Sequence, residues 1–524
     1  MIKAMIKISK KTIALIIASV FMTAFILISL TIATVLFIRS SNAIQSNTLN
    51  ISNASSDLNS SPLTTIIQST PIPTQNTNIV SYLVPVTGFK ELRNNISLQD
   101  LKNSKVIVME SDKDLISKNF PNLNLESLND KNYIEKLANG NDIGLIPWQK
   151  LAPQLKVLSV DNMSFFDKTI DRSKYSLQYS VTSYTSSVTS TTQDNASFNI
   201  NNLTRIVSTG EIIPARTVDK IMRLKNNYQY PFEAVKPFLD KFDARIGTLE
   251  SPLLGTGNGS TCALGCMNFV ANEKFSTGLQ YSGINLVTLA DNHSMNAGIA
   301  GISNTLTILD SIGIKHVGAA ITNNEDATDP AIIDVNGIRY GVLGYDDIPS
   351  VNDWATDTKG GTGRIDDNNY HILAGRVAKD VKRAKDKGAQ FVIAMMHWGA
   401  REYTNEPLPH QKELAHNLID NGVDLVVGDH PHWVMSTEFY TPSTGGDAKF
   451  IYYGIGNFVF DQDWSVETSQ GSFLEMNFYN NKLISLHIYP HHIYLTQPRI
   501  VDESSPEYKQ IMDRIWQFTG KINV

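Results

Sequence analysis

The distribution of hydrophobic positions divides the chain into three regions. An almost uninterrupted apolar stretch runs from Thr12 to Ile38, long enough to cross a hydrocarbon layer of about 30 Å as a helix. Ser, Thr, Asn, Gln and Pro dominate residues 41–78, a composition that buries too little apolar surface to offset the entropy of ordering. From Ile79 onward, short apolar runs alternate with helix-like segments. The pattern predicts a transmembrane helix, a disordered stalk and a folded α/β region.

Positive charge predicts the orientation of the apolar stretch. Four lysines precede it within the first 11 residues, and Arg39 alone follows closely. This bias predicts a cytoplasmic tip and anchor at 1–40, a single-pass cell-membrane protein and a bulk that is extracellular. A cleavable signal peptide is the alternative, because Ser41-Asn42-Ala43 resembles a cleavage site, although the apolar run exceeds the ~7–15 residues usual there.

Residues 79–180 have the pattern of a small α/β domain. The runs that carry this pattern are strand-like at Lys105–Met109 and Ile143–Pro147, and helix-like at Leu98–Lys102 and Asn132–Leu137. The segments Ile96–Leu101 and Gly140–Trp148 resemble recurrent segments of the solute-binding-protein fold, which implies one lobe of such a protein. A spacer domain is the alternative. Ser and Thr dominate the next stretch, so 181–203 is predicted to be a linker.

Residues 204–497 alternate strand-like runs with amphipathic helices, which predicts a layered α/β domain. The runs are Arg205–Ser208, Ala244–Gly247, Ile284–Leu289, Arg339–Gly344, Phe391–Met396, Val423–Val427 and Phe450–Tyr453. Gly422 is placed to end the helix before Val423, and Asn480-Asn481 to join two strands as an antiparallel hairpin. Residues 498–524 are expected to form a C-terminal tail helix.

Metal-ligand side chains recur where predicted strands end. They are Glu211, Glu250, Asn292, His293, His397, His430 and His432. Taken singly, each has a structural explanation, such as a helix cap for Asn292 or a hydrogen-bonded core residue for His397. Sites of α/β proteins assemble at strand ends, so we expect these side chains to converge. Together they supply the mixed oxygen and nitrogen ligands that suit divalent Zn, Mn or Fe.

Six ordered motifs carry a family resemblance. They are Gly210–Arg216, Thr248–Pro252, Ala290–His293, His397–Tyr403, Gly428–His432 and Gly454–Phe460. This set resembles the CapA/PgsA family of capsule and poly-γ-glutamate synthesis proteins, whose domain is similar to calcineurin-like metallophosphoesterases. The resemblance implies a layered α-β-β-α domain over 204–497.

The resemblance also implies roles for the strand-end residues. Glu211 and His432 would hold one metal ion, Asn292, His397 and His430 a second, and Glu250 would bridge the two. In such a site a shared hydroxide attacks a phosphoryl group while His293 protonates the leaving group. Arg216 is the candidate clamp for an anionic substrate.

This sequence departs from the family pattern in the first metal group. Glu211 stands where the family usually has Asp, and Ile213 where classical metallophosphoesterases have His. Single-metal occupancy or loss of turnover is therefore an alternative to a complete two-metal site. Trp398 and Tyr403 either line a substrate cleft or serve as packing.

Charge and cysteine content exclude some functions. The net charge of −6 is mild for 524 residues, and acidic and basic residues are interspersed, which leaves no nucleic-acid footprint. Cys262 and Cys266 lie in a Gly/Ser/Thr-rich loop, and an exported location favours a local disulfide. A metal pair is the alternative use of the two cysteines.

The leading hypothesis is a membrane-anchored factor in capsule or poly-γ-glutamate biosynthesis whose C-terminal domain is a metal-dependent hydrolase. Its partners would be an anionic envelope or capsular polymer and membrane-embedded synthesis or export proteins. The second hypothesis is a non-enzymatic scaffold of such a complex with a degenerate metal site. The third is a ligand-binding surface protein built on residues 79–180.

Overall fold

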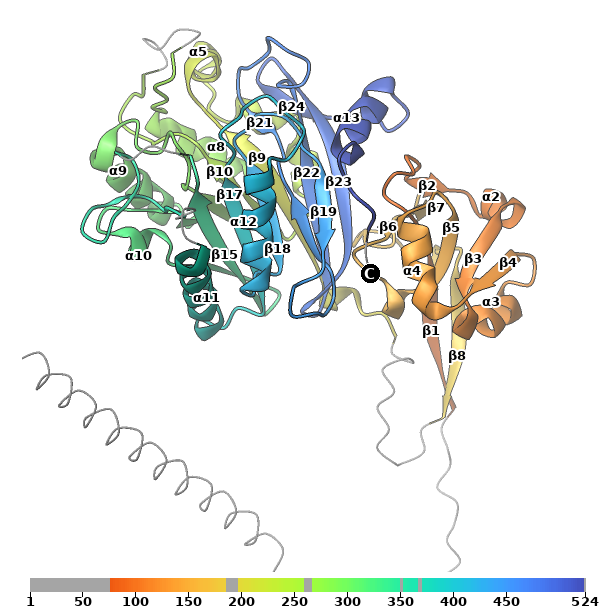
Figure 1. Ribbon diagram of the computed structural model, residues 1–524. Coiled ribbons are helices and arrows are strands. Elements are labelled where there is room, and N and C mark those ends of the chain that lie inside the picture. Colours follow the sequence, from red (N-terminus) through yellow and green to blue (C-terminus); the bar gives the residue numbers. More distant parts are fainter. Residues whose placement is uncertain (1–75, 185–196, 259–265, 349–351, 366–369, 523–524) are drawn as a thin grey trace, which may run out of the picture. The chain divides into compact units, whose positions relative to one another are not determined.

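The computed structural model describes residues 76–184, 197–258, 266–348, 352–365 and 370–522 (Figure 1). Among these residues, no helix is long and apolar enough to cross a membrane. The predicted span Thr12–Ile38 lies outside them. Strand β1 begins at Asn76, inside the predicted stalk 41–78, and β8 extends to Tyr184, inside the predicted linker 181–203. The small domain is therefore wider at both ends than the sequence predicted.

The small domain is a mixed sheet flanked by short helices. The strand order is β4-β3-β5-β1-β6, and β8 pairs with β1. The strands are β1 (Asn76–Thr87), β3 (Lys105–Met109), β4 (Asn124–Leu128), β5 (Ile143–Pro147), β6 (Lys156–Val157) and β8 (Gln178–Tyr184); the helices are α2 (Leu98–Asn103), α3 (Lys113–Asn119) and α4 (Asp130–Ala138). The two strands and two helices predicted for this region are confirmed as β3, β5, α2 and α4.

The C-terminal part contains a first large sheet with strand order β12-β11-β10-β9-β22-β23-β24, and β21 also pairs with β9. The strands are β9 (Leu203–Ile212), β10 (Ala244–Leu249), β11 (Leu286–Thr288), β12 (Lys315–Val317), β21 (Asn457–Val459), β22 (Gln470–Tyr479), β23 (Lys482–Tyr494) and β24 (Gln497–Ile500). Strands β9 to β12 run parallel, whereas β22 and β23 form the antiparallel hairpin predicted at Asn480-Asn481.

A second large sheet has the order β14-β15-β17-β18-β20-β19. Its strands are β14 (Ala331–Val335), β15 (Ile338–Asp346), β17 (Phe391–His397), β18 (Leu425–Asp429), β19 (Thr437–Tyr440) and β20 (Lys449–Tyr452). Strands β15, β17, β18 and β20 are parallel. Helix α12 (Pro409–Asp420) starts with Pro at its first position, and Gly422 at φ +99° lets the chain turn back into β18.

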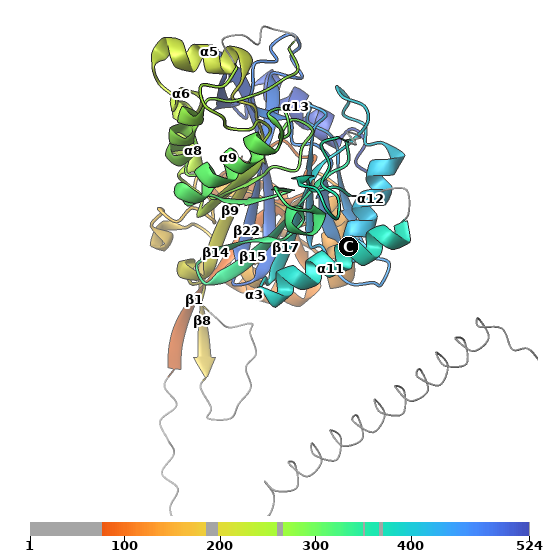
Figure 2. The same ribbon diagram turned by 90° about the vertical axis from the view of Figure 1, so that its left-hand side faces the viewer.

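Alternating side chains of the strands place the two sheets face to face. Ile206 of β9 and Ile393 of β17 share one buried cluster, while their neighbours Val207 and Val392 face opposite ways into separate clusters. The outer face of the first sheet packs on α5 (Arg216–Lys225), α8 (Ser276–Ser282) and α9 (Gly298–Ser311), and that of the second on α11 (Tyr370–Asp386) and α12 (Figure 2). The domain is a mixed α/β fold with two sheets between helices.

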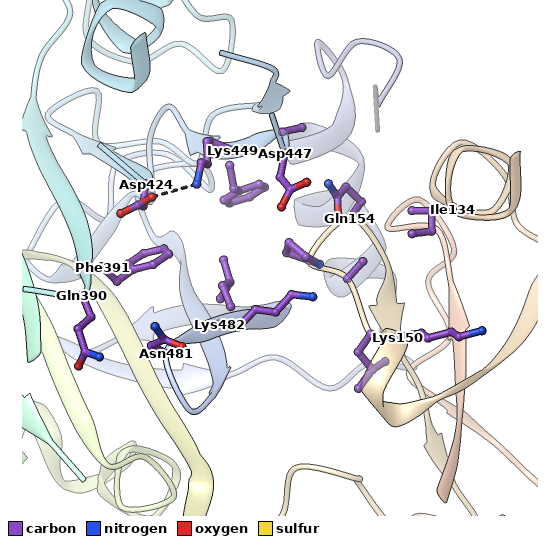
Figure 3. Close-up of a pocket in the computed structure, with 16 residues that line it drawn as sticks. Ile134, Lys150, Gln154, Gln390, Phe391, Asp424, Asp447, Lys449, Asn481 and Lys482 are labelled. Atoms are coloured by element: carbon purple, nitrogen blue, oxygen red, sulfur yellow. Dashed lines mark hydrogen bonds and ion pairs between the residues drawn. The ribbon is translucent and has the colours of Figure 1, made fainter. Parts of the chain in front are cut away.

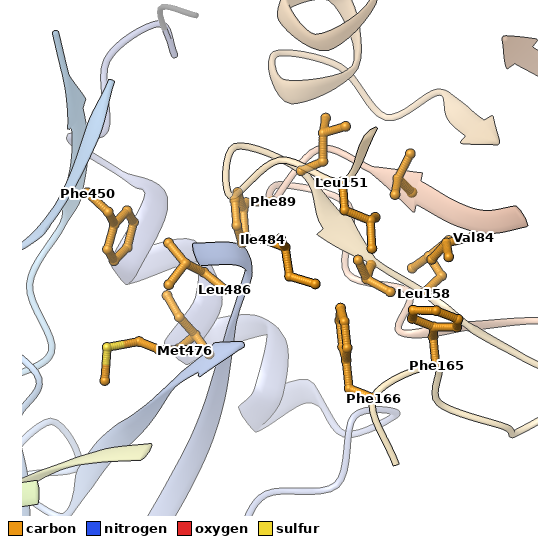
Figure 4. Packing of buried hydrophobic residues seen from close by; sticks show 14 of the residues in the cluster. Val84, Phe89, Leu151, Leu158, Phe165, Phe166, Phe450, Met476, Ile484 and Leu486 are labelled. Atoms are coloured by element: carbon orange, nitrogen blue, oxygen red, sulfur yellow. The ribbon is translucent and has the colours of Figure 1, made fainter. Parts of the chain in front are cut away.

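The small domain shares a core with the C-terminal part. Val84, Phe165 and Leu158 belong to the same buried cluster as Met476 and Leu486 of the β22–β23 hairpin (Figure 4). Helix α13 (Pro506–Trp516) contributes as well: the Trp516 ring lies 5.2 Å from that of Phe89, and Asn94 donates a 2.8 Å hydrogen bond to Tyr508. Apolar burial therefore joins the two parts, which group as one compact unit over 74–524.

A cavity of about 470 Å³ lies where the small domain meets the C-terminal part (Figure 3). Charged residues of both parts line it, including Lys150, Lys449 and Asp424, and a 2.9 Å ion pair joins Lys449 to Asp424. None of the predicted metal ligands lines this cavity. The metal ligands predicted at the strand ends therefore lie elsewhere in the molecule.

Candidate metal centre

The predicted ligands come together at the carboxyl ends of parallel strands from both sheets. Glu211 lies near the end of β9, Glu250 directly follows β10, and His397 is the last residue of β17. The Thr248 hydroxyl of β10 donates a hydrogen bond to Asp429 at the end of β18, which joins the two sheets at this edge. The strand-end rule therefore predicted correctly that these side chains lie close together, and their role as metal ligands stays a prediction.

One ligand group centres on the Nε2 atom of His397. This atom lies 2.9 Å from Asn292 Oδ1, 3.1 Å from His430 Nδ1 and 3.8 Å from Glu250 Oε1. Ligand bonds of about 2.0–2.1 Å in a tetrahedral site place neighbouring ligand atoms about 3.4 Å apart. Asn292, His430 and Glu250 therefore each lie within ligand-to-ligand reach of His397 Nε2.

A buried carboxylate sets the tautomer of His397. The Nδ1–H group donates to Asp429 Oδ1 at 2.7 Å, so Nε2 keeps the lone pair that a metal requires. Burial opposes a charge on the ring, but Asp429 and Glu250 outweigh it and raise the pKa of His397 well above its ordinary value. A proton on Nε2 therefore competes with metal for this nitrogen. The sequence reasoning had not assigned this role to Asp429.

Glu250 is the residue that most clearly requires a cation. Its side chain is fully buried, and neither carboxylate oxygen has a hydrogen-bond partner among the described residues. Burial, and then the charge of Glu211, raise the pKa of Glu250 well above its ordinary value. A buried carboxylate without partners is costly unless it is neutralised or coordinates a metal. The donor set and this unsatisfied carboxylate together fit a divalent ion.

A second ligand group surrounds His432. Its Nδ1 atom lies 2.5 Å from Glu211 Oε2 and 2.9 Å from Asn457 Oδ1. The amide nitrogen of Asn457 donates to the Thr468 carbonyl at 2.9 Å, which turns the oxygen toward His432. Burial raises the pKa of Glu211, but His432 outweighs this and lowers it overall. Asn457 was missed as a candidate, although its place in the Gly454–Phe460 motif at the start of β21 was a usable signal.

The second group has no ligand at position 213, where classical metallophosphoesterases have histidine and this chain has Ile213. Ile213 is fully buried in an apolar cluster with Ala215, Phe269 and Phe460. The groups are nevertheless adjacent, because one ring nitrogen of His397 and one carboxylate oxygen each of Glu211 and Asp429 all lie within 4.8 Å of one another, so these three residues could also hold an ion.

Unusual backbone conformations cluster around the site. His430, His432, Tyr403 and Arg216 have φ of +87°, +58°, +58° and +48°. Residues other than glycine rarely adopt positive φ, and such strain concentrates where the surrounding structure imposes it for function. Gly428 has a steric role instead: a Cβ there would lie 2.3 Å from Trp398 Nε1. Trp398 is fully buried, so it serves as packing rather than as a cleft wall.

His293 and Asp291 have defined hydrogen-bond roles. Asn296 Oδ1 accepts the Phe269 backbone N–H at 2.6 Å, so the His293 Nδ1 atom, 2.9 Å from the same oxygen, carries the proton. Nε2 is then the free nitrogen, 3.8 Å from Glu250 Oε1. Burial lowers the pKa of His293 to about 4. The Asp291 carboxylate accepts the backbone N–H groups of His293 and Ser294, so it holds the loop rather than facing a metal.

Arg216 has a partner that the sequence reasoning did not foresee. Its guanidinium pairs with the Asp461 carboxylate through Nε and Nη2, and it lies over the Phe460 ring. Asp461 also accepts the Thr217 backbone N–H at 2.9 Å. Because both side chains are buried, this pair fixes the start of α5, and the guanidinium is not the open anion clamp expected from sequence. Nearby, Cys266 is disulfide-bonded, while Cys262 lies outside the described residues.

Comparison with known proteins now decides the family. The chain is 30% identical over 295 residues to the capsule biosynthesis protein CapA of Bacillus anthracis, covering 56% of this chain and 68% of that protein. The family model of the bacterial capsule synthesis protein PGA_cap matches residues 205–462. The chain belongs to this capsule synthesis family. The family resemblance expected from the six motifs is therefore confirmed.

Two further likenesses differ in weight. The PGA biosynthesis protein CapA of Bacillus subtilis is 26% identical over 303 residues, which is 58% of this chain and 75% of that protein. The solved calcineurin-like phosphoesterase YfkN from Bacillus subtilis matches 55% of this chain and 90% of that chain at 11% identity and a TM-score of 0.32. That score is too low to assign a common fold, so the chemistry of this family member is argued from its own residues.

Proposed function

We propose that this capsule-family protein is a metal-dependent hydrolase of phosphoester type that acts in capsule or poly-γ-glutamate production. The observation that carries the proposal is Glu250, a fully buried carboxylate with no hydrogen-bond partner for either oxygen among the described residues. His397 Nε2 lies 3.8 Å from Glu250 Oε1, and the same nitrogen is 2.9 Å from Asn292 Oδ1 and 3.1 Å from His430 Nδ1. This arrangement is costly without a cation and is accounted for by one.

Each residue has a defined task in this proposal. Asn292, His397 and His430 would hold one ion, Glu211 and His432 a second, and Glu250 would be shared. A divalent ion supplies Lewis acidity, lowers the pKa of water and neutralises charge on a phosphoryl oxygen. Asp429 accepts a hydrogen bond from the His397 Nδ1–H group, which leaves Nε2 as the nitrogen for the ion.

His293 is the proposed proton donor to the leaving group. Its Nδ1 proton is committed to Asn296, so Nε2 is the nitrogen that exchanges protons with substrate. Because burial lowers the pKa of His293 to about 4, the ring is neutral at pH 7, and Nε2 must first take a proton from solvent water. That proton is then held weakly, which favours its transfer to a leaving-group oxygen.

The setting of this activity is also part of the proposal. The apolar stretch Thr12–Ile38 would anchor the chain, with the described residues outside the cell. The proposed substrate is an anionic envelope or capsular polymer, and the anchor would bring the site to membrane-embedded synthesis partners. The relatives named for capsule and PGA biosynthesis support the choice of polymer.

A non-enzymatic scaffold is the second candidate function. The observation that favours it is Ile213, which fills with an apolar side chain the position where the metallophosphoesterase pattern has a histidine. A site with a single ion could hold a phosphate or carboxylate group of a polymer without hydrolysing it.

Metal content and turnover of the full chain test the proposal. We expect one to two equivalents of divalent metal and phosphodiesterase or phosphomonoesterase activity, both lost in His430→Ala/His432→Ala. The matched control is His316→Ala/His416→Ala, which removes two imidazoles that pair with Asp310 and Glu438. Metal-free protein contradicts both the hydrolase and the metal site. Bound metal without turnover on either ester class favours the scaffold.

A further inference from the structure

A buried histidine on strand β23 reaches the backbone of the second ligand group. His491 is fully buried, and its Nε2 atom donates a 2.9 Å hydrogen bond to the carbonyl oxygen of Asn457. The side-chain oxygen of the same asparagine lies 2.9 Å from His432 Nδ1. A carbonyl oxygen only accepts hydrogen bonds, so the His491 ring carries its proton on Nε2. This proton ties the core of the domain to a residue of the candidate metal centre.

Apart from this hydrogen bond, burial of the His491 imidazole is unfavourable. Its Nδ1 atom is buried and has no hydrogen-bond partner among the described residues. The ring packs on Phe473, with centroids 4.6 Å apart, and on Phe458, with centroids 5.9 Å apart. A phenyl ring would fill this apolar space without an unsatisfied nitrogen. The imidazole therefore surpasses a phenyl ring here in one respect, which is the bond from Nε2 to Asn457.

Two glycines let neighbouring strands approach the Asn457 peptide closely. Gly471 of β22 is paired with His491 of β23. A Cβ on Gly471 would collide with the carbonyl oxygen of Asn457 and would lie 2.7 Å from His491 Nε2. A Cβ on Gly210 of β9 would collide with the carbonyl oxygen of Gly456, the residue before Asn457. The absence of side chains at both points keeps the path of the hydrogen bond open.

The place of the Asn457 peptide decides the geometry of the ligand group. Asn457 is paired with Glu211 across β21 and β9, so two members of the group extend from neighbouring strands. A shift of this peptide would move the Asn457 amide oxygen relative to Glu211 and His432. Residues that orient ligands from behind are therefore part of what sets metal affinity.

We infer that His491 is a positioning residue for the second ligand group: its Nε2–H fixes the Asn457 peptide and thereby places the amide oxygen beside His432 Nδ1. This inference rests on the proposed function, since that group would hold one of two ions. The role is one of position, because the proton that the ring carries is bonded to a backbone carbonyl.

Three replacements of His491 separate the hydrogen bond from the packing. His491→Phe keeps a ring and removes the donor. His491→Gln puts an N–H donor at about the place of Nε2, whereas His491→Asn carries the same amide one methylene closer to the backbone. His492→Phe is the matched control, because the neighbouring His492 pairs with Glu507 at 2.7 Å and is 34% exposed. His432→Ala identifies which ion belongs to the second ligand group.

Calorimetric titration of the metal-free full chain with Zn²⁺ measures the affinity of each ion. We expect the wild type to bind two ions, and His491→Phe and His491→Asn to weaken the ion that His432→Ala removes by about 10- to 100-fold, with the other unchanged. His491→Gln and His492→Phe should bind both ions as the wild type does. Denaturant unfolding of the metal-free proteins should give a different order: His491→Gln, with an amide among phenyl rings, should be less stable than His491→Phe and yet bind this ion more tightly.

Each other outcome overturns a defined part of the inference. Equal binding of both ions by wild type and His491→Phe removes the positioning role and leaves the hydrolase proposal intact. A wild type that binds a single ion does the same, because the second ligand group is then not an ion site. Loss of both ions in parallel with stability in all three variants makes His491 a packing residue. If His491→Phe does not fold, the comparison of His491→Gln with His491→Asn decides. A wild type that binds no metal overturns the proposed function as well.

Discussion

The substitution Glu250→Gln should change the stability of the metal-free and metal-bound protein in opposite directions. Both Glu250 oxygens are buried without partners, so the metal-free protein carries the desolvation cost of that carboxylate. Such a group costs about 1–3 kcal/mol, more when charged. Glutamine has the same shape and no charge. The metal-free variant should therefore exceed metal-free wild type in free energy of unfolding, by about 1.4 kcal/mol for each pH unit above 4.5 over which the native carboxyl keeps its proton.

Metal reverses the order of the two proteins. At a free metal concentration 100 times Kd, binding adds about 2.7 kcal/mol to the wild type. The amide introduced by Glu250→Gln is a weaker ligand than the carboxylate, so the variant should gain little. Chemical unfolding of both proteins with EDTA and with added Zn²⁺ or Mn²⁺ measures the four free energies. Addition of EDTA should destabilise the wild type and leave the variant nearly unchanged.

The pH dependence of the metal-free proteins has a definite sign. Because the pKa of Glu250 is raised in the native state, the native protein keeps a proton that the unfolded chain releases above about 4.5. The stability of the wild type therefore falls as pH rises from 4.5 toward the native pKa, and Glu250→Gln removes this contribution. The advantage of the variant should be small near pH 4.5 and should grow toward neutral pH.

Glu475→Gln is the matched control. Glu475 is equally buried but is satisfied by Arg205 at 2.7 Å and by the Tyr489 hydroxyl at 2.7 Å. Its neutralisation leaves Arg205 without its partner and should cost about 3–5 kcal/mol with or without metal. A metal-free Glu250→Gln protein less stable than wild type, or one that EDTA destabilises as much as wild type, would refute the reasoning about Glu250.

Three further substitutions test neighbouring parts of the site. Ile213→His should supply the absent imidazole and raise metal content toward two equivalents by elemental analysis; unchanged content would mean that the apolar cluster keeps the ring away. Arg216→Met should cost about 3–5 kcal/mol in denaturant unfolding by leaving Asp461 unpaired, and Arg216→Met/Asp461→Leu should recover most of it. Gly428→Ala should lower the melting temperature by several degrees through its clash with buried groups, whereas Gly375→Ala, in open space on α11, should not; equal effects would contradict the steric role of Gly428.

Local pattern explains why much of the site was predictable. The sequence predicts Glu211, Glu250 and His397 as candidates because each lies at the end of a predicted strand. Parallel pairing then brings the carboxyl ends of these strands to one edge of each sheet. The same logic does not reveal Asp461, which lies 245 residues from its partner Arg216 and follows no periodicity. Partners across the fold depend on the packing of both sheets, which a single sequence does not display.

The boundaries of the small domain were less predictable for a related reason. Asn76 and Tyr184 lie in Ser-, Thr- and Asn-rich stretches whose composition favours a stalk and a linker. They are strand residues because β1 and β8 pair with each other from Asn76–Tyr184 to Tyr82–Gln178. Pairing between two polar segments about one hundred residues apart depends on their register in the fold, which cannot be read from amino-acid composition.

The β1–β8 pair also affects how this protein would carry mechanical load. Asn76 is paired with Tyr184 and Tyr82 with Gln178, so the chain enters and leaves the small domain at the same end of one antiparallel ladder. Tension between the segment before Asn76 and the segment after Tyr184 would act on the first pair of this ladder and open its hydrogen bonds one after another. The apolar core that the small domain shares with the C-terminal part, rather than this ladder, would have to resist a force applied to the chain by a moving polymer or a membrane tether.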